Sequence, residues 1–227
     1  MLIQPGALGK LLGFPPRMIE VHHLNNSRSQ RVLWLLEELA LPYTIVPYQR
    51  DAKTMLAPPE LKAVHPLGKS PVIRENGEVI AESGAILEYL IERHGGGRLA
   101  PARGTPAFER YRYWLHYAEG SLMTQLLLKL YLGRVGEPAK TLLERVESQI
   151  RMHLDYVEGQ LGDAPFLAGR ELTAADVQMS FPLELAATQK LLDERQPGLQ
   201  RLIKEWHARP AYRRALERGG PYVYAKD

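Results

Sequence analysis

One short stretch of the chain, residues 65–86, concentrates the residue types that could bind an anionic small molecule. Its sequence is HPLGKSPVIRENGEVIAESGAI. Glu82 and Ser83 stand directly before an apolar stripe at helical spacing, which makes Ser83 a plausible N-cap. The start of a helix leaves backbone N–H groups without partners, and these groups suit a carboxylate ligand. Pro71 stands before a short β-favouring run, so it must lie at an edge, at a strand start or in a cis turn.

Local patterns predict a hairpin that carries this stretch. Val72–Glu75 and Glu78–Ala81 are short β-favouring runs, and Asn76-Gly77 joins them. This pair best tolerates a positive φ at both central positions of a two-residue turn. We therefore expect two antiparallel strands followed by the helix that Ser83 opens.

Upstream of the hairpin, the sequence predicts a strand, a helix and a second strand. They are expected at Ile19–Leu24, Ser29–Leu39 and Tyr43–Tyr48. Pro47, near the end of the last of these, indicates an edge strand. The complete order is strand, helix, strand, a looping segment, hairpin and helix, which is the order of a thioredoxin fold. In that layout the loop after the first strand, residues 25–28, lies beside the proline turn.

The chain as a whole resembles the glutathione S-transferase superfamily, and it looks closest to the serine-type branch and its fungal and bacterial relatives. Four segments carry the resemblance: HLNNSRSQRVLWLLEEL at 23–39, HPLGKSPVI at 65–73, AESGAILEYL at 81–90 and FLAGRELTAADV at 166–177. They span both domains of that family in the expected order. The resemblance implies an α/β plus all-α fold, with an N-terminal thioredoxin-like domain followed by an all-helical C-terminal domain. It also implies a homodimer.

Glycine and proline signals suggest where the domains divide. Three consecutive glycines end one predicted helix, and Thr105-Pro106 opens the next, so we place a linker at 95–104. The thioredoxin-like domain is then expected at 18–94 and the helical domain at 105–227. Within the helical domain, the segment from Thr173 to Asp176 resembles a capping box, with a role in folding.

Composition excludes several classes of function. The net charge of +3 in 227 residues is too small to indicate a nucleic-acid partner. Without any cysteine the chain has no disulfide framework, no redox dithiol, no cysteine nucleophile and no C-x-x-C metal site. Residues 1–17 have an apolar stretch broken by glycine and proline, so we interpret them as an extension, neither signal peptide nor membrane span. We expect a cytoplasmic protein without metal or membrane partner.

The resemblance implies that a glutathione thiol must ionise near neutral pH. A free thiol has a pKa of about 8.5, and a hydroxyl donor or a helix N-terminus near the sulfur favours the thiolate. Ser27 lies between the first predicted strand and helix, in the loop where the serine branch places its catalytic serine. Asn25 and Asn26 are alternatives, because some relatives use an asparagine amide as the donor. A structural role also stays open, in which Ser27 or Ser29 only caps the helix.

Five residues are expected to bind glutathione by the same resemblance. Ser70 presents its backbone to the cysteinyl portion, and Pro71, cis in the family, turns that backbone toward the ligand. Glu82 would hold the γ-glutamyl ammonium, and Ser83 with its helix N-terminus the carboxylate. Lys69 could reach the glycine carboxylate, or it could be a solvated turn lysine.

The second substrate would lie between the domains. Tyr113, Trp114 and Tyr117 are candidates for its pocket, although aromatic residues at helical spacing are also typical of a core. By analogy, Glu119 could reach glutathione across a dimer interface. The expected function is detoxification, in which glutathione, as cosubstrate, is conjugated to small hydrophobic electrophiles. The alternatives are a glutathione-dependent peroxidase or disulfide-bond reductase, and a non-catalytic binding module.

Overall fold

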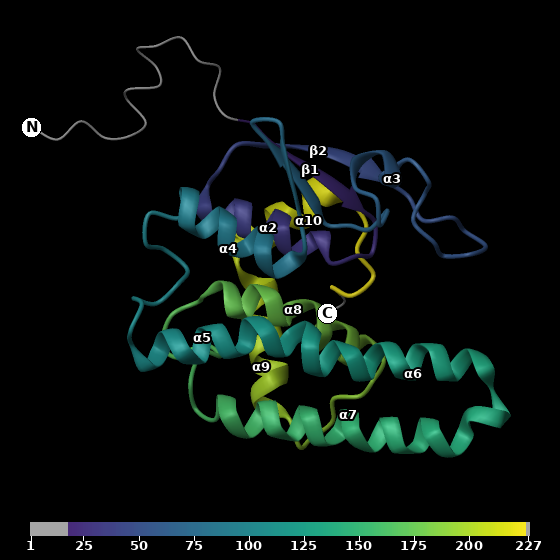
Figure 1. The fold of residues 1–227 in the computed structure, drawn as a ribbon. Coiled ribbons are helices and arrows are strands. Elements are labelled where there is room, and N and C mark those ends of the chain that lie inside the picture. The colour runs from purple at the N-terminus through teal and green to yellow at the C-terminus, as the bar shows by residue number, and fades with distance from the viewer. Residues whose placement is uncertain (1–17, 226–227) are drawn as a thin grey trace, which may run out of the picture.

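The computed structural model describes residues 18–225, which form a sheet-containing part and a helical part (Figure 1). The extension expected at residues 1–17 lies outside the described residues. The sheet has the strand order β2-β1-β3-β4, with bounds β1 Ile19–Leu24, β2 Tyr43–Tyr48, β3 Val72–Glu75 and β4 Glu78–Ala81. β1 pairs in parallel with β2 and antiparallel with β3, and β3 pairs antiparallel with β4. This topology confirms the predicted thioredoxin-like domain.

The hairpin region has the turn that the sequence predicts and the cis proline that the resemblance implies. Asn76 and Gly77 have φ values of 52° and 85°, as a two-residue turn with two left-handed positions requires. The peptide bond between Ser70 and Pro71 is cis. The edge position predicted for β2 is also confirmed, because only β1 pairs with it.

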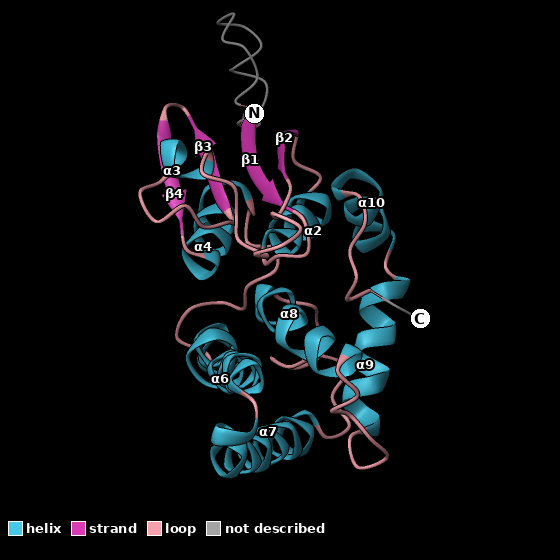
Figure 2. Cartoon of the chain, turned by 90° about the vertical axis from the view of Figure 1, so that its right-hand side faces the viewer, coloured by secondary structure: helices cyan, strands magenta, loops and turns pink. Residues whose placement is uncertain are grey.

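Two helices separate the sheet from the helical part. α2 (Ser29–Leu39) and α4 (Ser83–His94) lie on the face of the sheet that is turned toward the other helices (Figure 2). The looping segment contains only the short α3 (Leu61–Val64). One prediction was wrong in detail: the N-cap residue of α4 is Glu82, with φ 71°, and Ser83 is the first helical residue. The backbone enters the helix from a left-handed conformation one residue earlier than the side-chain pattern suggested.

The remainder of the described chain is helical, as expected for the C-terminal domain. The helices are α5 (Pro106–Tyr117), α6 (Met123–Val135), α7 (Lys140–Leu161), α8 (Ala174–Thr188), α9 (Pro197–Ala208) and α10 (Pro210–Gly219). A π-helical turn at Ala118–Leu122 joins α5 to α6, and a short 3₁₀ turn at Glu137–Ala139 precedes α7. Within residues 18–225, no helix has both the length and the apolar character needed to cross a bilayer.

Side-chain caps fix the starts of two of these helices. Thr105 Oγ1 accepts the N–H of Phe108 at 3.2 Å, and Pro106 occupies the first turn of α5. At α8, Asp176 Oδ2 accepts the N–H of Thr173 at 3.0 Å, and the Thr173 hydroxyl caps the helix in return. The predicted capping box is therefore confirmed.

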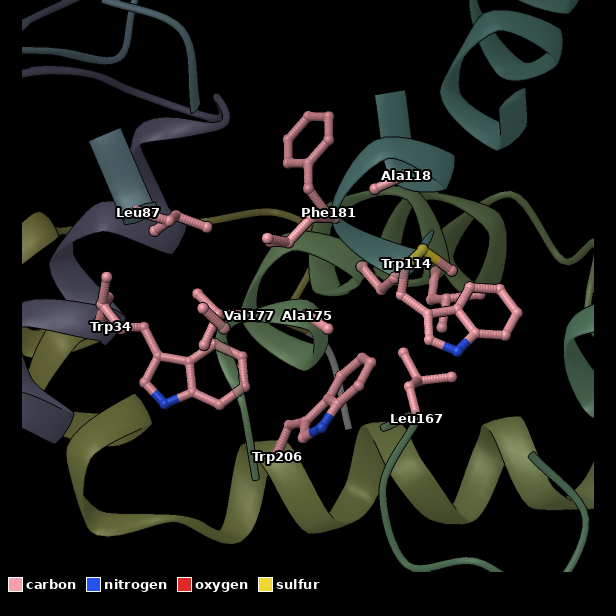
Figure 3. Close-up of a cluster of buried hydrophobic side chains, with 14 of the residues drawn as sticks. Trp34, Leu87, Trp114, Ala118, Leu167, Ala175, Val177, Phe181 and Trp206 are labelled. Atoms are coloured by element: carbon pink, nitrogen blue, oxygen red, sulfur yellow. The ribbon is translucent and has the colours of Figure 1, made fainter. Parts of the chain in front are cut away.

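A single apolar core runs through both parts of the molecule. α8 lies at its centre, and Ala175 and Val177 stand among aromatic rings that come from different elements (Figure 3). Trp34 of α2 and Trp206 of α9 are both 0% exposed, with ring centroids 6.0 Å apart. Because these rings come from opposite parts of the chain, the two parts share one packed core.

The last helix returns to the sheet-containing part. α10 packs against α2 beside the sheet (Figure 2), where the side chain of Tyr212 contacts Trp34 edge to face at 5.1 Å. Glu37 of α2 binds two arginines of α10, Arg214 at 2.8 Å and Arg218 at 3.1 Å. The thioredoxin-like part is thus covered by the most C-terminal helix of the chain.

Candidate functional site

The loop after β1 and the proline turn lie side by side, as the thioredoxin layout predicts. The Ser70 hydroxyl donates to the backbone carbonyl of His22 at 2.9 Å and accepts the N–H of Leu24 at 3.3 Å. These two bonds fix the turn before β3 to the end of β1. The loop of residues 25–28 begins directly after Leu24, so its first residue lies next to the turn that contains the cis Pro71.

Glu82 and Ser83 lie at the same end of the sheet. Val72 pairs with Ala81, which places Pro71 opposite Glu82 at the ends of β3 and β4. Glu82 is exposed, whereas Ser83 is 5% exposed in the first turn of α4. An acidic side chain, a helix N-terminus and the backbone beside a cis proline therefore meet at one end of the sheet. Lys69 is exposed in the turn that leads to Ser70.

The hydroxyl of Ser27 is directed into the protein. Ser27 is 4% exposed, and its Oγ accepts the N–H of Ser29 at 3.2 Å and lies 2.8 Å from Ser29 Oγ. Ser29 Oγ has one proton and two neighbouring acceptors, His23 Nδ1 at 2.9 Å and the Leu24 carbonyl at 3.2 Å. The proton between the two hydroxyls must therefore come from Ser27. Ser27 would have to break this buried bond before donating to a ligand.

His23 is held in the tautomer that maintains this direction. Its Nε2 lies 3.1 Å from the carbonyl oxygen of Gly219, which can only accept, so Nε2 carries a proton. Burial lowers the pKa of His23 below its ordinary value, and the hydrogen bond to Gly219 offsets part of this effect. The ring is therefore neutral at pH 7, and its Nδ1 acts as an acceptor for Ser29.

The two asparagines of the loop have their amides oriented by backbone N–H groups. Asn25 Oδ1 accepts the N–H of Arg50 at 2.8 Å, and Asn26 Oδ1 accepts the N–H of Val223 at 2.9 Å. Because a backbone N–H only donates, the facing atom in each case is the carbonyl oxygen. Each amide nitrogen therefore points away from that contact, and neither has a hydrogen-bond partner among residues 18–225.

The two side chains face different directions. Arg50 follows β2, which lies on the opposite side of β1 from β3, so Asn25 is directed away from the proline turn. Val223 belongs to the segment after α10, whose Tyr224 ring contacts Phe181 of α8 at 5.3 Å. Asn26 therefore faces the region between the two parts of the molecule. Its φ of 49° is a left-handed conformation that asparagine tolerates well.

Two arginines of the same region share the single carboxylate of Glu119. Its two carboxylate oxygens lie 2.9 Å from Arg28 Nε, and Oε1 lies 2.6 Å from Arg31 Nη1. Burial raises the pKa of Glu119, but Arg31 and Arg28 outweigh this effect and hold the pKa at about 2. Glu119 is engaged within its own chain in this way. One carboxylate balances only one of the two guanidinium charges, so Arg28, Arg31 and Glu119 together keep one positive charge.

The three aromatic candidates for the second-substrate pocket fall in different environments. Tyr113 and Tyr117 line a groove of about 540 Å³ along α5, together with other residues at helical spacing (Glu109, Arg112, His116, Gly120 and Ser121). Trp114 is 3% exposed and belongs to the core (Figure 3). The Tyr117 hydroxyl lies 2.5 Å from His153 Nδ1, and the Tyr113 hydroxyl bonds Tyr156 at 2.9 Å. The groove is lined by none of the glutathione-binding candidates.

A larger cavity of about 630 Å³ contains Glu38, Arg98, Arg170 and Arg209 but none of the predicted site residues. Among residues 18–225, no group of three or more histidine, aspartate or glutamate side chains could hold a metal ion. Sequence reasoning missed Val223, which contacts the loop through its backbone. The aromatic pair Tyr222 and Tyr224 was the one signal that this segment is packed.

Comparison with known proteins gives a consistent family. Family models for the glutathione S-transferase N-terminal and C-terminal domains match residues 27–93 and 115–210. Glutathione S-transferase 1 of Saccharomyces cerevisiae is 34% identical over 223 residues, covering 88% of this chain and 95% of the yeast protein.

Solved structures agree with the sequence comparison. The crystal structure of a glutathione S-transferase from Actinobacillus pleuropneumoniae is 33% identical, with a TM-score of 0.82, and covers 91% of this chain and 94% of its own. A glutathione transferase family member from Pseudomonas fluorescens, solved with two glutathione molecules bound, is 25% identical with a TM-score of 0.75, covering 93% and 98% of the two chains. With both domain models matched in order and these relatives spanning most of its length, the chain belongs to the glutathione S-transferase family of enzymes.

Proposed function

We propose that this enzyme conjugates glutathione to small hydrophobic electrophiles, and that the carboxamide of Asn26 stabilises the bound thiolate. After the thiol proton has left, the sulfur forms a bond to the electrophilic carbon, and the bond that breaks is the one to a leaving group such as a halide, or the ring C–O bond of an epoxide. The protein contributes sulfur ionisation, orientation of the two substrates and apolar binding. The donor is then the amide nitrogen of Asn26 rather than the hydroxyl of Ser27.

The orientation of Asn26 is the observation that carries this proposal. Its carbonyl oxygen is bound by the N–H of Val223 at 2.9 Å, which leaves its two N–H donors for a ligand. The proton of Ser27, in contrast, is used in a buried bond to Ser29. A donor that hydrogen-bonds to a thiolate favours the charged form and lowers its pKa. The start of α2, two residues after Ser27, adds the field of a helix N-terminus.

We propose that glutathione binds at the end of the sheet where Pro71, Glu82 and Ser83 lie. The backbone at Ser70 and the cis Pro71 would pair with the cysteinyl portion, as an added strand does. Glu82 would bind the γ-glutamyl ammonium, and the start of α4 at Ser83 its carboxylate. Lys69, which is exposed near the same turn, would bind the glycine carboxylate.

The thiolate absorbance of the glutathione complex, recorded against pH, tests the donor. We expect Asn26→Ala to raise the pKa of the bound thiol by about 1–2, equivalent to about 1.4–2.7 kcal/mol, and to lower kcat. Ser27→Ala and Asn25→Ala are the matched controls and should titrate close to the parent enzyme. A shift in Ser27→Ala with none in Asn26→Ala would assign the donor to the hydroxyl instead.

A calorimetric titration with glutathione separates binding from activation. Glu82→Gln should weaken affinity by about 1–3 kcal/mol, because a charged group of the ligand loses its partner. The thiol pKa of the saturated variant should stay unchanged. If the parent protein bound no glutathione in this titration, the result would contradict the proposed conjugation and favour a non-catalytic module that binds other partners.

A second function, glutathione-dependent reduction of disulfides or peroxides, has one observation in its favour. The Pseudomonas fluorescens relative was solved with two glutathione molecules bound, and such a reaction needs a second glutathione to complete it. Because this chain has no cysteine, no protein thiol can take part, so the electrons would have to come from glutathione thiols, which are oxidised to glutathione disulfide. Rates with aromatic halides, epoxides, peroxides and mixed disulfides distinguish the two enzymes.

We also propose that the enzyme is a cytoplasmic homodimer. Support for a dimer comes from the apolar side chains exposed along α6 and α7: Leu128, Tyr131, Met152 and Tyr156. Light scattering coupled to gel filtration measures the mass directly, and cell fractionation tests the location.

A further inference from the structure

The segment that follows α10 returns to the loop that carries Asn26. α10 ends at Gly219, and residues 220–225 run from there toward the region between the two parts of the molecule. The N–H of Val223 is the only contact by which this segment bonds an asparagine side chain of the loop within the described residues. The two residues are separated by 197 positions in the sequence.

A buried carboxylate holds this segment in place. Glu184 of α8 is 1% exposed, and its Oε2 accepts the Tyr222 hydroxyl at 2.8 Å. Its other oxygen accepts the hydroxyl of Tyr212 at 2.7 Å and lies 3.3 Å from His207. Because a buried carboxylate must keep its donors, the position of Tyr222 is fixed, and Val223 is the next residue.

Aromatic contacts hold the other side of Val223. The ring of Tyr224 packs edge to face on Phe181 at 5.3 Å and on Tyr222 at 5.3 Å. Phe181 also lies beneath the guanidinium of Arg28 at 5.2 Å, so the same ring touches both the segment and the loop. Val223 is 42% exposed, and its N–H lies between two anchored neighbours, Tyr222 and Tyr224.

We infer that residues 220–225 position the thiol-activating amide, with the N–H of Val223 setting which end of the Asn26 carboxamide faces the bound sulfur. The terminal torsion of asparagine is broad, so an unheld amide would turn either its oxygen or its nitrogen toward the ligand. An oxygen facing a thiolate is repulsive, whereas the N–H donors stabilise it. Val223 is a positioning residue in this arrangement. The inference rests on the proposed role of Asn26.

Removal of the single N–H tests the inference. Val223→Pro deletes the donor, and Val223→Ala is the matched control that keeps it. We expect Val223→Pro to raise the pKa of bound glutathione and lower kcat in the same direction as Asn26→Ala, with the KM for glutathione nearly unchanged. Val223→Ala should titrate like the parent enzyme. A chain truncated after Gly220 also lacks this N–H and should reproduce the effect of Val223→Pro. Because it contains no new proline, it tests the same N–H without the distortion that a proline can cause.

The double variant Asn26→Ala/Val223→Pro separates this inference from the proposed function. If Val223 acts through the amide, the double variant shows no larger thiol pKa than Asn26→Ala alone. Additive shifts, or an unchanged thiol pKa in both Val223→Pro and the truncated chain, would overturn the positioning role while leaving Asn26 as the donor. An unchanged thiol pKa in Asn26→Ala would instead overturn the donor assignment, and the positioning role with it.

Discussion

The carboxylate of Glu119 joins the two parts of the molecule at the scale of single residues. It lies in the π-helical turn between α5 and α6, where an irregular turn changes the direction in which side chains leave the helix. Its partner Arg31 is 1% exposed, so the pair keeps a buried guanidinium neutralised. The same contact fixes the start of α2, and with it the loop of the proposed thiol donor.

Replacement of Glu119 by glutamine should destabilise the protein at neutral pH. Breaking a buried ion pair lowers the free energy of unfolding by several kcal/mol. Because the Glu119 side chain is 34% exposed, we expect a loss at the lower end of that range, about 3 kcal/mol. Chemical denaturation measures it. Glu109→Gln, which breaks the exposed pair with Arg112, is the control and should cost less than about 0.5 kcal/mol.

The stabilisation that Glu119 contributes to the folded protein depends on pH in a defined direction. The folded pKa of Glu119, about 2, lies below the ordinary value of 4.5, so the unfolded chain binds the proton more readily. The stabilisation is complete above pH 4.5 and is lost as the pH falls toward 2. The parent and Glu119→Gln should therefore converge in stability on acidification, and a constant difference would contradict this.

The end of α10 shows how closely two elements can approach. A Cβ placed on Gly219 would lie 2.8 Å from Leu33 Cδ1, 3.0 Å from Gln30 Oε1 and 3.3 Å from His23 Nε2. Leu33 and Gln30 are both buried, so neither can move aside freely. The absence of a side chain is what allows α10 to rest on α2.

Gly219→Ala should therefore destabilise the protein by about 1–3 kcal/mol, the cost of overpacking a filled site. Gly133→Ala is the matched control, because a Cβ at that helical position meets nothing within 4 Å. Since alanine is the better helix former, the control should be neutral or stabilised by up to about 1 kcal/mol. Thermal denaturation compares the two variants, and equal melting temperatures would refute the close packing.

At the scale of helices and strands, the features that adjacent residues determine could be predicted from the sequence. The Asn76-Gly77 turn and the Thr173–Asp176 capping box each depend on a few adjacent side chains. The N-cap of α4 was missed by one residue, because the left-handed backbone of Glu82 replaces the side-chain cap expected from Ser83. Helix boundaries depend on such backbone details, which residue type alone does not determine.

Features of the site that depend on distant contacts could not be predicted. The direction of the Ser27 proton follows from His23 and Gly219, which are 196 residues apart. The orientation of Asn26 follows from Val223, at a similar separation. The sequence therefore identified the loop with its three candidate donors, while the choice among them required tertiary contacts.

At the scale of the whole molecule, the continuous core predicts cooperative unfolding. Trp34 and Trp206, from the two parts, contact each other in that core and are both fully buried. We expect urea denaturation followed by tryptophan fluorescence and by far-ultraviolet circular dichroism to give coincident transitions. Two separated transitions would mean that the parts unfold independently, contrary to their shared packing.

The contact between α10 and α2 also affects how the protein can be made. β1 and α2 leave the ribosome early in synthesis. α10, which covers α2, spans residues 210–219 and leaves the ribosome after every other helix that the structure describes. Until then, the apolar surface around Leu33 and Trp34 lacks its final partner, and an incomplete chain exposes it to other proteins. A chain that stops before residue 210 would therefore leave this apolar surface of α2 uncovered, even though the sheet and most of the helical part had already been made.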